Sequence, residues 1–248
     1  MKHTERFTTD QEVLGSTPSR RTKKMNILNN IYEKFYIFFN LYIKNTIHKK
    51  KTYYAEDKED LLVLKKIKKK NGYFVDVGCF HPTRINNTYL LYKKGWRGLN
   101  IDMNKFSIKL FNLVRPEDEN IHSAVSSVKG KIFYYTSKKL ALTSSLSKKK
   151  DLNIKVKVDS DSLNNIIYSS KFKGKKIDFL SLDCEGHDLE VLRTINLKKF
   201  SPKIICVEIP KSDYGNNIKK NLTYKYIVSK QYKLIFSSSN NCMFEKNK

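Results

Sequence analysis

The fold is decided by residues 72–104, which read GYFVDVGCFHPTRINNTYLLYKKGWRGLNIDMN. The apolar run that ends at Gly78 predicts a buried strand followed by a tight turn, because glycine adopts turn conformations that other residues avoid. Residues 87–94 predict a helix that Gly95 ends, and residues 98–102 predict a second strand that ends in an acid. This strand–helix–strand order is typical of a parallel α/β sheet.

The same alternation of short apolar runs and helical stretches continues to the end of the chain. Further strands are predicted at 121–125, 131–136, 177–183 and 203–209, and further helices at 105–114, 160–170, 188–196 and 217–230. A polar loop is predicted at 137–151, and a C-terminal antiparallel hairpin at 232–237 and 242–245. We therefore expect a Rossmann-like α/β fold, with a mostly parallel sheet, helices on both faces and the hairpin as an antiparallel edge.

Polar or small residues stand where the predicted strands end. They are Asp76, Gly78, Asp102, Ser123, Asp183, Glu185 and Glu208. In an open α/β sheet, ligands bind beyond the carboxyl ends of the strands, at the point where the strand order reverses. We therefore expect these side chains to line one ligand site.

The spacing from Asp76 and Gly78 to Asp102 is that of a nucleotide-binding strand–helix–strand unit. A carboxylate at the end of the second strand can accept both ribose hydroxyl protons. No Gly-x-Gly-x-x-Gly follows the first strand, and residues 79–82 (CFHP) would make a poor pyrophosphate cradle. These residues favour a nucleoside without a pyrophosphate. S-adenosylmethionine fits, with its adenosine on Asp102 and its amino-acid part near Asp76 and Gly78.

Residues 1–50 differ from the rest of the chain, and we expect one domain over residues 51–248. Residues 1–24 are polar and lack the apolar stretch of a signal peptide. Residues 27–51 place apolar and aromatic side chains at helical spacing before three lysines, but interrupting charges exclude a bilayer-spanning segment. Two alternatives stay open, namely a helix on an anionic membrane surface and a helix packed on the core. We expect a cytoplasmic protein, peripheral at a membrane under the first alternative.

The amino-acid composition excludes some classes of protein and bears on the kind of partner. Only 9 Gly and 5 Pro occur in 248 residues, which excludes a collagen-like or low-complexity structural protein. The formal net charge of +25 is compatible with polyanionic partners such as nucleic acid, anionic lipid or glycan, and equally with a Lys- and Asn-rich composition that has no such partner. Lysine greatly outnumbers arginine, the residue preferred for bidentate contacts to phosphate and guanine, so nucleic acid is the less favoured partner. The four cysteines form no Cys-x-x-Cys pair, so we expect free thiols and no metal site.

Four segments, in register, resemble the FkbM family of S-adenosylmethionine-dependent methyltransferases. They are residues 74–104, 115–135, 177–195 and 202–209. The third, IDFLSLDCEGHDLEVLRTI, is similar to the family signature KIDFLKIDVEGHELEVL. The resemblance runs from about residue 52 to 246. It implies a class I methyltransferase fold, S-adenosylmethionine as cofactor and O-methyl transfer, usually to a hydroxyl of a sugar or a polyketide-type acceptor.

The resemblance also implies roles for single residues. It implies that Asp76, Gly78 and Asp102 contact the cofactor, that Ser123 and Ala124 lie against adenine, and that Asp183, Glu185 and His187 of the Asp-x-Glu-Gly-His signature border the methyl group and the acceptor. By their positions in the chain, Cys79 and His81 after the first strand are further candidate cofactor contacts, and Glu208 at a strand end is either a structural hydrogen-bonding residue or a further catalytic or acceptor-binding candidate. Ser181 stands where many members have Lys, and Met103 where Pro is common. Neither change removes a group that the chemistry needs.

Methyl transfer from a sulfonium is an in-line displacement, so the protein mainly has to align donor and acceptor. A sugar hydroxyl is a poor nucleophile unless a positioned base takes its proton. We expect Asp183 to be the essential carboxylate and His187 to be a candidate base. Which of the two takes the proton stays open.

Three functions are compatible with the sequence. The favoured one is an O-methyltransferase that acts on a sugar hydroxyl in a surface glycan or its precursor. The second is an RNA ribose or cap methyltransferase, or a basic nucleic-acid-binding protein. RNA 2′-O-methyltransferases typically use a Lys-Asp-Lys-Glu tetrad, and no Lys stands at matching strand ends here. The third is a membrane-surface protein without catalysis.

Overall fold

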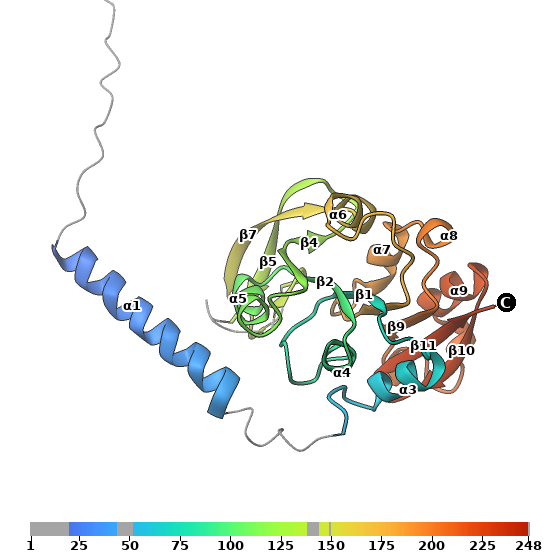
Figure 1. The fold of residues 1–248 in the computed structure, drawn as a ribbon. Coiled ribbons are helices and arrows are strands. Elements are labelled where there is room, and N and C mark those ends of the chain that lie inside the picture. The colour runs from blue at the N-terminus through green and yellow to red at the C-terminus, as the bar shows by residue number, and fades with distance from the viewer. Residues whose placement is uncertain (1–19, 44–51, 138–143, 149, 248) are drawn as a thin grey trace, which may run out of the picture.

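The computed structural model describes residues 20–43, 52–137, 144–148 and 150–247 (Figure 1). Seven strands form the central sheet, in the order β10-β11-β9-β8-β1-β2-β3. Their bounds are β1 Tyr73–Val77, β2 Arg97–Asp102, β3 Glu119–His122, β8 Phe179–Leu182, β9 Ile204–Glu208, β10 Tyr232–Ser237 and β11 Asn241–Lys246. Strand β1 pairs in parallel with both β2 and β8, so the strand order reverses between β1 and β8.

The predicted C-terminal hairpin is present, but it is not a simple antiparallel edge. Strand β11 is antiparallel to both β9 and β10, so the reversed strand lies one position inside the edge. The sequence explains this order, because Cys242, Met243 and Phe244 of β11 are fully buried between two strands. Strand β10, which carries Lys233 and Ser237, takes the outer position.

Helices cover both faces of the central sheet (Figure 1). They are α3 Glu59–Lys66, α4 Tyr89–Lys93, α5 Lys105–Val114, α6 Leu163–Ser169, α7 Asp188–Arg193, α8 Leu197–Phe200 and α9 Leu222–Ser229. Side chains of β1 alternate between two hydrophobic clusters, with Val75 and Val77 in one and Phe74 in the other. This alternation is what a strand buried on both faces requires. The predicted mostly parallel α/β sheet is therefore confirmed.

Two strand predictions needed correction. The run at 121–125 forms two short strands, because the chain leaves the central sheet at Ser123 and continues as β4 Ala124–Val125 in a second sheet. That sheet has the order β4-β7-β5-β6, with β5 Gly130–Thr136, β6 Ser144–Ser145 and β7 Ile154–Asp161. Strand β7 was not predicted. Only two of its eight residues are buried, so it lacks the apolar run of a buried strand, and pairing with β5 over seven residue pairs holds it.

Part of the predicted 217–230 helix is not α-helical. The short 3-10 helices η2 Lys211–Asp213 and η3 Ile218–Lys220 precede α9. Asn221 begins α9, and its side-chain oxygen accepts hydrogen bonds from the backbone N–H groups of Thr223 and Tyr224. An asparagine in this position satisfies amides that have no partner inside the helix, so the α-helix begins there.

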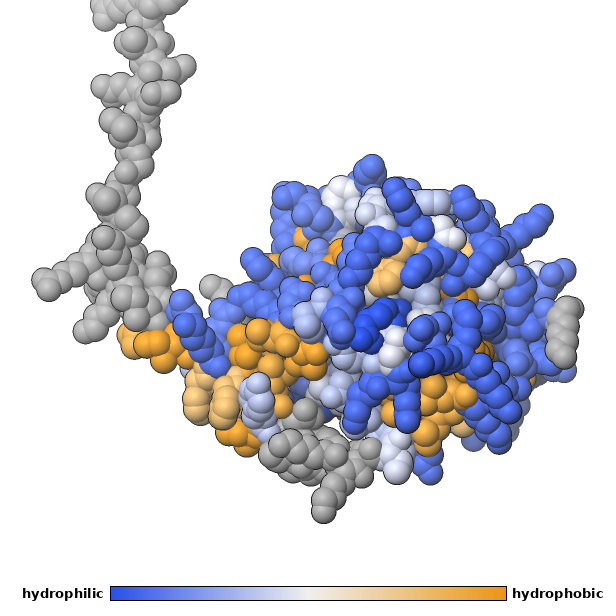
Figure 2. Space-filling view, viewed as in Figure 1, coloured by the Kyte–Doolittle hydropathy of each residue, from blue (hydrophilic) through white to orange (hydrophobic). Residues whose placement is uncertain are grey.

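The N-terminal segment contacts the rest of the structure along one side and leaves other apolar side chains exposed. Helix α1 Arg20–Phe38 continues as a π-helix, η1 Phe39–Ile43. Its C-terminal half contacts α5, where the rings of Tyr36 and Phe106 lie 5.4 Å apart and Glu33 pairs with Lys109. Large apolar side chains on other sides stay exposed, namely Leu28, Ile31, Tyr32, Phe35, Phe38, Tyr42 and Ile43. Figure 2 shows hydrophobic surface where α1 meets the domain.

Arg115 is fully buried and fixes the loop between β1 and α4. Its guanidinium donates hydrogen bonds to the carbonyl oxygen of Pro82 at 2.8 and 3.0 Å and to the side-chain oxygens of Asn86 and Thr88 at 2.6 and 2.9 Å. The Thr88 hydroxyl in turn donates to Asp76 at 2.8 Å. A buried guanidinium is tolerated only when it is paired in this way, so the loop has one conformation.

We expect Arg115→Met to destabilise the fold strongly, because the carboxylates of Asp76 and Asp118 would lose their buried cation. Removal of one partner of a buried charged network costs about 3–5 kcal/mol. Urea unfolding followed by circular dichroism measures this change. Lys131→Met is the control, since Lys131 and Asp159 are both largely exposed and lie 3.8 Å apart. Its effect should stay below about 1 kcal/mol, and equal losses in the two variants would contradict the role given to Arg115.

Candidate active site

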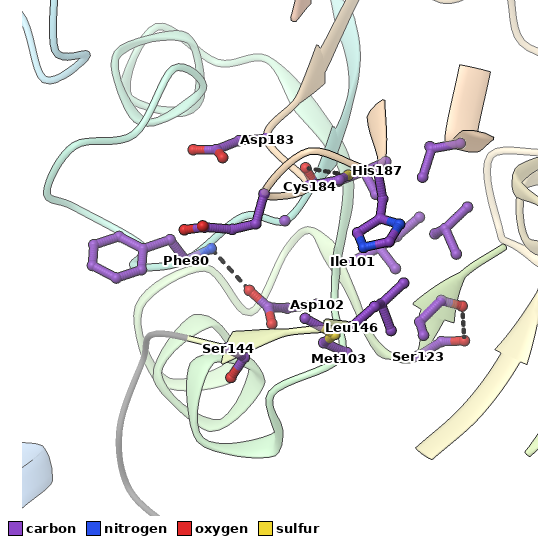
Figure 3. Close-up of a pocket in the computed structure, with 16 residues that line it drawn as sticks. Phe80, Ile101, Asp102, Met103, Ser123, Ser144, Leu146, Asp183, Cys184 and His187 are labelled. Atoms are coloured by element: carbon purple, nitrogen blue, oxygen red, sulfur yellow. Dashed lines mark hydrogen bonds between the residues drawn. The ribbon is translucent and has the colours of Figure 1, made fainter. Parts of the chain in front are cut away.

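A cleft of about 700 Å³, open to solvent, lies at the carboxyl ends of the central strands (Figure 3). We call it the main cleft. It is lined by Val77, Gly78, Phe80, Ile101, Asp102, Met103, Ser123, Ala124, Val125, Ser144, Leu146, Asp183, Cys184, Glu185, His187 and Val191. It spans the point between β1 and β8 where the strand order reverses. This is where the fold predicts a ligand.

Gly78 lies where the strand order reverses between β1 and β8. It follows β1 with φ of +73°, and a Cβ atom placed on it would lie 1.8 Å from the carbonyl oxygen of Asp183. Both the backbone conformation and this close approach exclude any side chain. The turn after β1 therefore lies directly against the turn after β8.

Asp102 ends β2, as predicted, and its carboxylate is held in a fixed orientation in the main cleft. One oxygen accepts a hydrogen bond from the backbone N–H of Phe80 at 3.0 Å, and the other accepts from that of Asn104 at 2.7 Å. Figure 3 shows the first of these bonds. Burial raises the pKa of Asp102 to about 6, and the two backbone hydrogen bonds oppose this rise. The group is therefore ionised at neutral pH and protonated in mild acid.

A strained turn after β8 presents the Asp-x-Glu-Gly-His residues. Glu185 has φ of +53° and Gly186 has φ of +91°, so two successive residues adopt left-handed conformations. Asp183 is exposed at the mouth of the cleft. The cleft walls and the carboxylates of Glu208 and Asp188 raise the pKa of Asp183. Non-glycine residues in this conformation are concentrated at functional sites, which fits the position of the turn.

The imidazole of His187 lies between a serine hydroxyl and a carboxylate. Its Nε2 lies 3.3 Å from the hydroxyl of Ser147, and its Nδ1 lies 3.6 Å from a carboxylate oxygen of Glu190. In Figure 3 the imidazole of His187 and the carboxylate of Asp183 point in different directions. Glu190, and not Asp183, is thus the acid placed to orient this histidine.

The structure brings most of the predicted site residues together. Gly78, Asp102, Ser123, Ala124, Asp183, Glu185 and His187 all line the main cleft. Asp76, Cys79, His81 and Glu208 do not. The Asp76 carboxylate accepts hydrogen bonds from Thr88 and Asn86, and the side chains of Cys79 and His81 are buried behind the loop. Asp76 therefore shapes the loop after β1 without facing the main cleft.

Glu208 lies in a second cavity next to the main cleft. We call it the acidic hollow. It is lined by Glu185, Gly186, Asp188, Leu189, Glu208, Ile209, Pro210, Asp213, Asn221 and Thr223. Glu185 lines both cavities. Burial and the charge of Glu208 raise the pKa of Asp188 to about 7.

Several lining residues were missed from the sequence. Phe80 follows β1 with φ of +56° and faces the cleft, and Ser144 and Leu146 belong to the segment predicted as a polar loop. Ser144 reaches the cleft because it pairs with Thr136 of β5 and accepts a hydrogen bond from the side chain of Asn104. Such long-range pairing has no local sequence signal. Within the described residues, no group of three or more His, Cys, Asp or Glu side chains could hold a metal ion.

Comparisons with known proteins bear on this site. A family model described as a methyltransferase FkbM domain matches residues 76–234. A comparison with curated proteins gives no match. Among solved structures, a TehB-like SAM-dependent methyltransferase from Corynebacterium glutamicum matches with 11% identity and a TM-score of 0.46, covering 88% of this chain and 100% of that one.

Two further structures are more distant. TrmK from M. capricolum, solved with S-adenosyl-homocysteine, has 13% identity and a TM-score of 0.36 over 76% of this chain and 68% of its own. Trm1 from Pyrococcus horikoshii, in complex with S-adenosyl-L-methionine, has 12% identity and a TM-score of 0.41 over 76% of this chain and 54% of its own. Likenesses this weak carry no argument about the acceptor.

Proposed function

The chain belongs to the FkbM family of S-adenosylmethionine-dependent methyltransferases, and we propose that it methylates a hydroxyl of a sugar in a surface glycan or its precursor. One observation carries the proposal. Asp102 at the end of β2 and Asp183 after β8 line the same cleft on the two sides of the strand-order reversal. Under this proposal, Asp102 would contact the donor and Asp183 the acceptor.

The main cleft fits the cofactor of this family. The two Asp102 oxygens are fixed by backbone N–H groups and keep lone pairs for the two ribose hydroxyls. The apolar side chains of Ile101, Met103 and Leu146 give a surface for a flat base, beside Ser123 and Ala124. When bound, the cofactor supplies an electrophilic methyl group. The role of this chain is then to hold donor and acceptor in line and to accept a proton.

Asp183 is the residue that we assign to the acceptor proton. Its raised pKa makes it a stronger base than an ordinary aspartate, because burial in the cleft and, after it, the neighbouring charges of Glu208 and Asp188 oppose the charged form. His187, held between Ser147 and Glu190, stays the second candidate base. Glu185 and Glu208 are placed to accept hydrogen bonds from acceptor hydroxyls, because they line the acidic hollow next to the main cleft.

The charge of the acidic hollow favours a sugar over RNA as the acceptor. The described residues that line it include no Lys or Arg. They include four carboxylates, namely Glu185, Asp188, Glu208 and Asp213. A phosphodiester backbone would be repelled there, because nucleic-acid affinity depends on cations that neutralise phosphates. Carboxylates are instead good acceptors for sugar hydroxyl groups. The +25 charge of the chain thus lies outside the part of the surface where the acceptor would bind.

We also propose that the exposed face of α1 and η1 lies on an anionic membrane surface. Phe35 and Phe38 are 62% and 51% exposed, and Lys34 and Lys44 flank them in the sequence. Apolar residues beside lysines are the combination by which interfacial helices bind acidic lipid. No described helix is long and apolar enough to cross a bilayer.

Replacement of Asp102 by Asn should weaken donor binding while the fold survives. The loss of a charged acceptor for two ribose hydroxyls is worth about 1.5–3 kcal/mol, or roughly 10–150-fold in affinity. Because the pKa of Asp102 is raised to about 6, wild-type affinity should also fall as the pH drops below 6, and this dependence should vanish in the variant. Calorimetry of donor binding measures both. The control is Asp159→Asn, because Asp159 is an exposed acid outside the cleft. Unchanged donor affinity in Asp102→Asn would show that Asp102 does not bind the ribose.

Asp183→Asn should lower turnover by at least about 100-fold and leave donor affinity nearly unchanged, because the amide keeps the shape of the side chain but accepts no proton. The measurement is transfer of a labelled methyl group to a panel of glycans, RNA and small hydroxy compounds. Methylation of RNA in preference to glycans would overturn the acceptor assignment. Near-full turnover of the variant on a verified acceptor would move the base to His187.

The full-length variant Phe35→Ser/Phe38→Ser should bind less well to vesicles that contain acidic phospholipid. Both side chains point to solvent, so their loss should not disturb the contact of Tyr36 with Phe106. Flotation with acidic and neutral vesicles measures binding, and 0.5 M salt should weaken it about as much as removal of the acidic lipid does. Equal flotation of the variant and the native chain would rule out this surface.

A further inference from the structure

We infer that the acceptor carries a protonated amino group beside the hydroxyl that is methylated, as an amino sugar does. This inference rests on the proposed function and concerns the acidic hollow. Among the described residues, four carboxylates and no Lys or Arg line the hollow, in a chain where Lys and Arg outnumber Asp and Glu by 49 to 24. In so basic a protein, an all-acidic cavity beside the main cleft is a local reversal of charge that calls for a cationic ligand.

Asp188 gives the second, independent observation. Its side chain is buried, with the residue only 3% exposed, and it lines the acidic hollow. One carboxylate oxygen accepts a hydrogen bond from the backbone N–H of Cys184 at 3.3 Å, whereas the other has no hydrogen-bond partner among the described residues. A buried carboxylate oxygen without a partner is costly unless a ligand supplies one.

An ammonium group matches what this carboxylate lacks. It is compact, carries a full positive charge and donates up to three hydrogen bonds. Inside a hollow lined by four acids it would meet several acceptors at once, and the pairing of opposite charges would offset the loss of water around them. A neutral N-acetyl group in the same place would leave the unpartnered oxygen of Asp188 without a countercharge.

The surroundings of the hollow argue against an anion and against a bound metal ion. The N-terminal amides of α9 could attract an anion, but the side chain of Asn221 already accepts their hydrogen bonds. No described group of three or more acidic, histidine or cysteine side chains has an arrangement that could hold a metal ion. The carboxylates are therefore close enough to repel one another but are not arranged as a metal site.

The position of the hollow connects this charge to the reaction. Glu185 lines both the hollow and the main cleft, and Asp183 is close enough to Asp188 and Glu208 for their charges to raise its pKa. An ammonium group held at Asp188 would place the neighbouring hydroxyl of the same sugar toward Asp183. The hollow would thus set which hydroxyl is methylated.

The test compares two acceptors of equal length, oligosaccharides of glucosamine and of N-acetylglucosamine, with the full chain and a labelled donor. We expect a KM at least about 10-fold lower for the amine, and calorimetry with S-adenosylhomocysteine present should show the same preference in binding. Asp188→Asn and Asp213→Asn should each reduce the preference at least threefold. Asp159→Asn removes one exposed acid elsewhere and should keep the preference. If Asp188→Asn does not fold, Asp213→Asn carries the test, because Asp213 is exposed.

The outcomes separate this inference from the proposed function. Equal use of both oligosaccharides, or preference for the N-acetyl compound, overturns the inference and leaves sugar methylation standing. Binding of the amine with transfer to RNA alone overturns both the proposed function and the inference, because the methylated acceptor then lacks the ammonium group. Methylation of the nitrogen, located by mass spectrometry, overturns both O-transfer and the inference, because the amine is then the group that reacts. Activity that requires Mg²⁺, is lost with EDTA and shows no preference for the amine would identify the hollow as a metal site and overturn the inference.

Discussion

The buried guanidinium of Arg115 is the constraint on which the site depends. It joins the carbonyl of Pro82 and the side chains of Asn86 and Thr88, while Asp118 lies 3.9 Å away on the other side. A buried charge needs hydrogen-bonding partners in fixed positions. A rearrangement of the loop after β1 would therefore expose the guanidinium to solvent or leave it buried without partners. The backbone N–H of Phe80 in that loop is one of the two that hold Asp102. The orientation of the cleft carboxylate therefore depends on an arginine that does not line the cleft.

A second constraint acts at the strand-order reversal. Gly78 and Asp183 touch through backbone atoms, which fixes the distance between the turn that carries Phe80 and the turn that carries Glu185. In a methyl transfer the protein contributes mainly alignment, and alignment suffers when either turn can shift. The left-handed conformations at Phe80 and Glu185 fit this demand, because strained turns persist only where the surrounding structure fixes them.

The sequence predicted the central sheet well because its strands are buried on both faces and appear as continuous apolar runs. It also placed Asp102 correctly, since a strand end and its last residue are local features. It did not predict β7, which is held by pairing with β5 rather than by burial. Nor did it separate Asp76, which faces Thr88, from Asp102, which faces the cleft. Alternation along a strand gives the face of a side chain, but the partners on that face come from loops whose paths depend on distant residues such as Arg115.

The chain as a whole is positively charged, whereas the acidic hollow is lined by carboxylates. Because screening limits the distance over which a charge acts, the two sets of charges act on different partners. At physiological salt a charge is screened beyond about 8 Å, so lysines on the outer surface act on large anionic partners and hardly on a ligand inside the acidic hollow. Within the hollow, Asp188 and its neighbours determine the field, because they are closer and partly shielded from water. Under the two proposals, the basic exterior would hold the protein near an anionic surface, while the acidic hollow would select a cationic part of the acceptor. Neither preference could be read from the net charge of +25 alone.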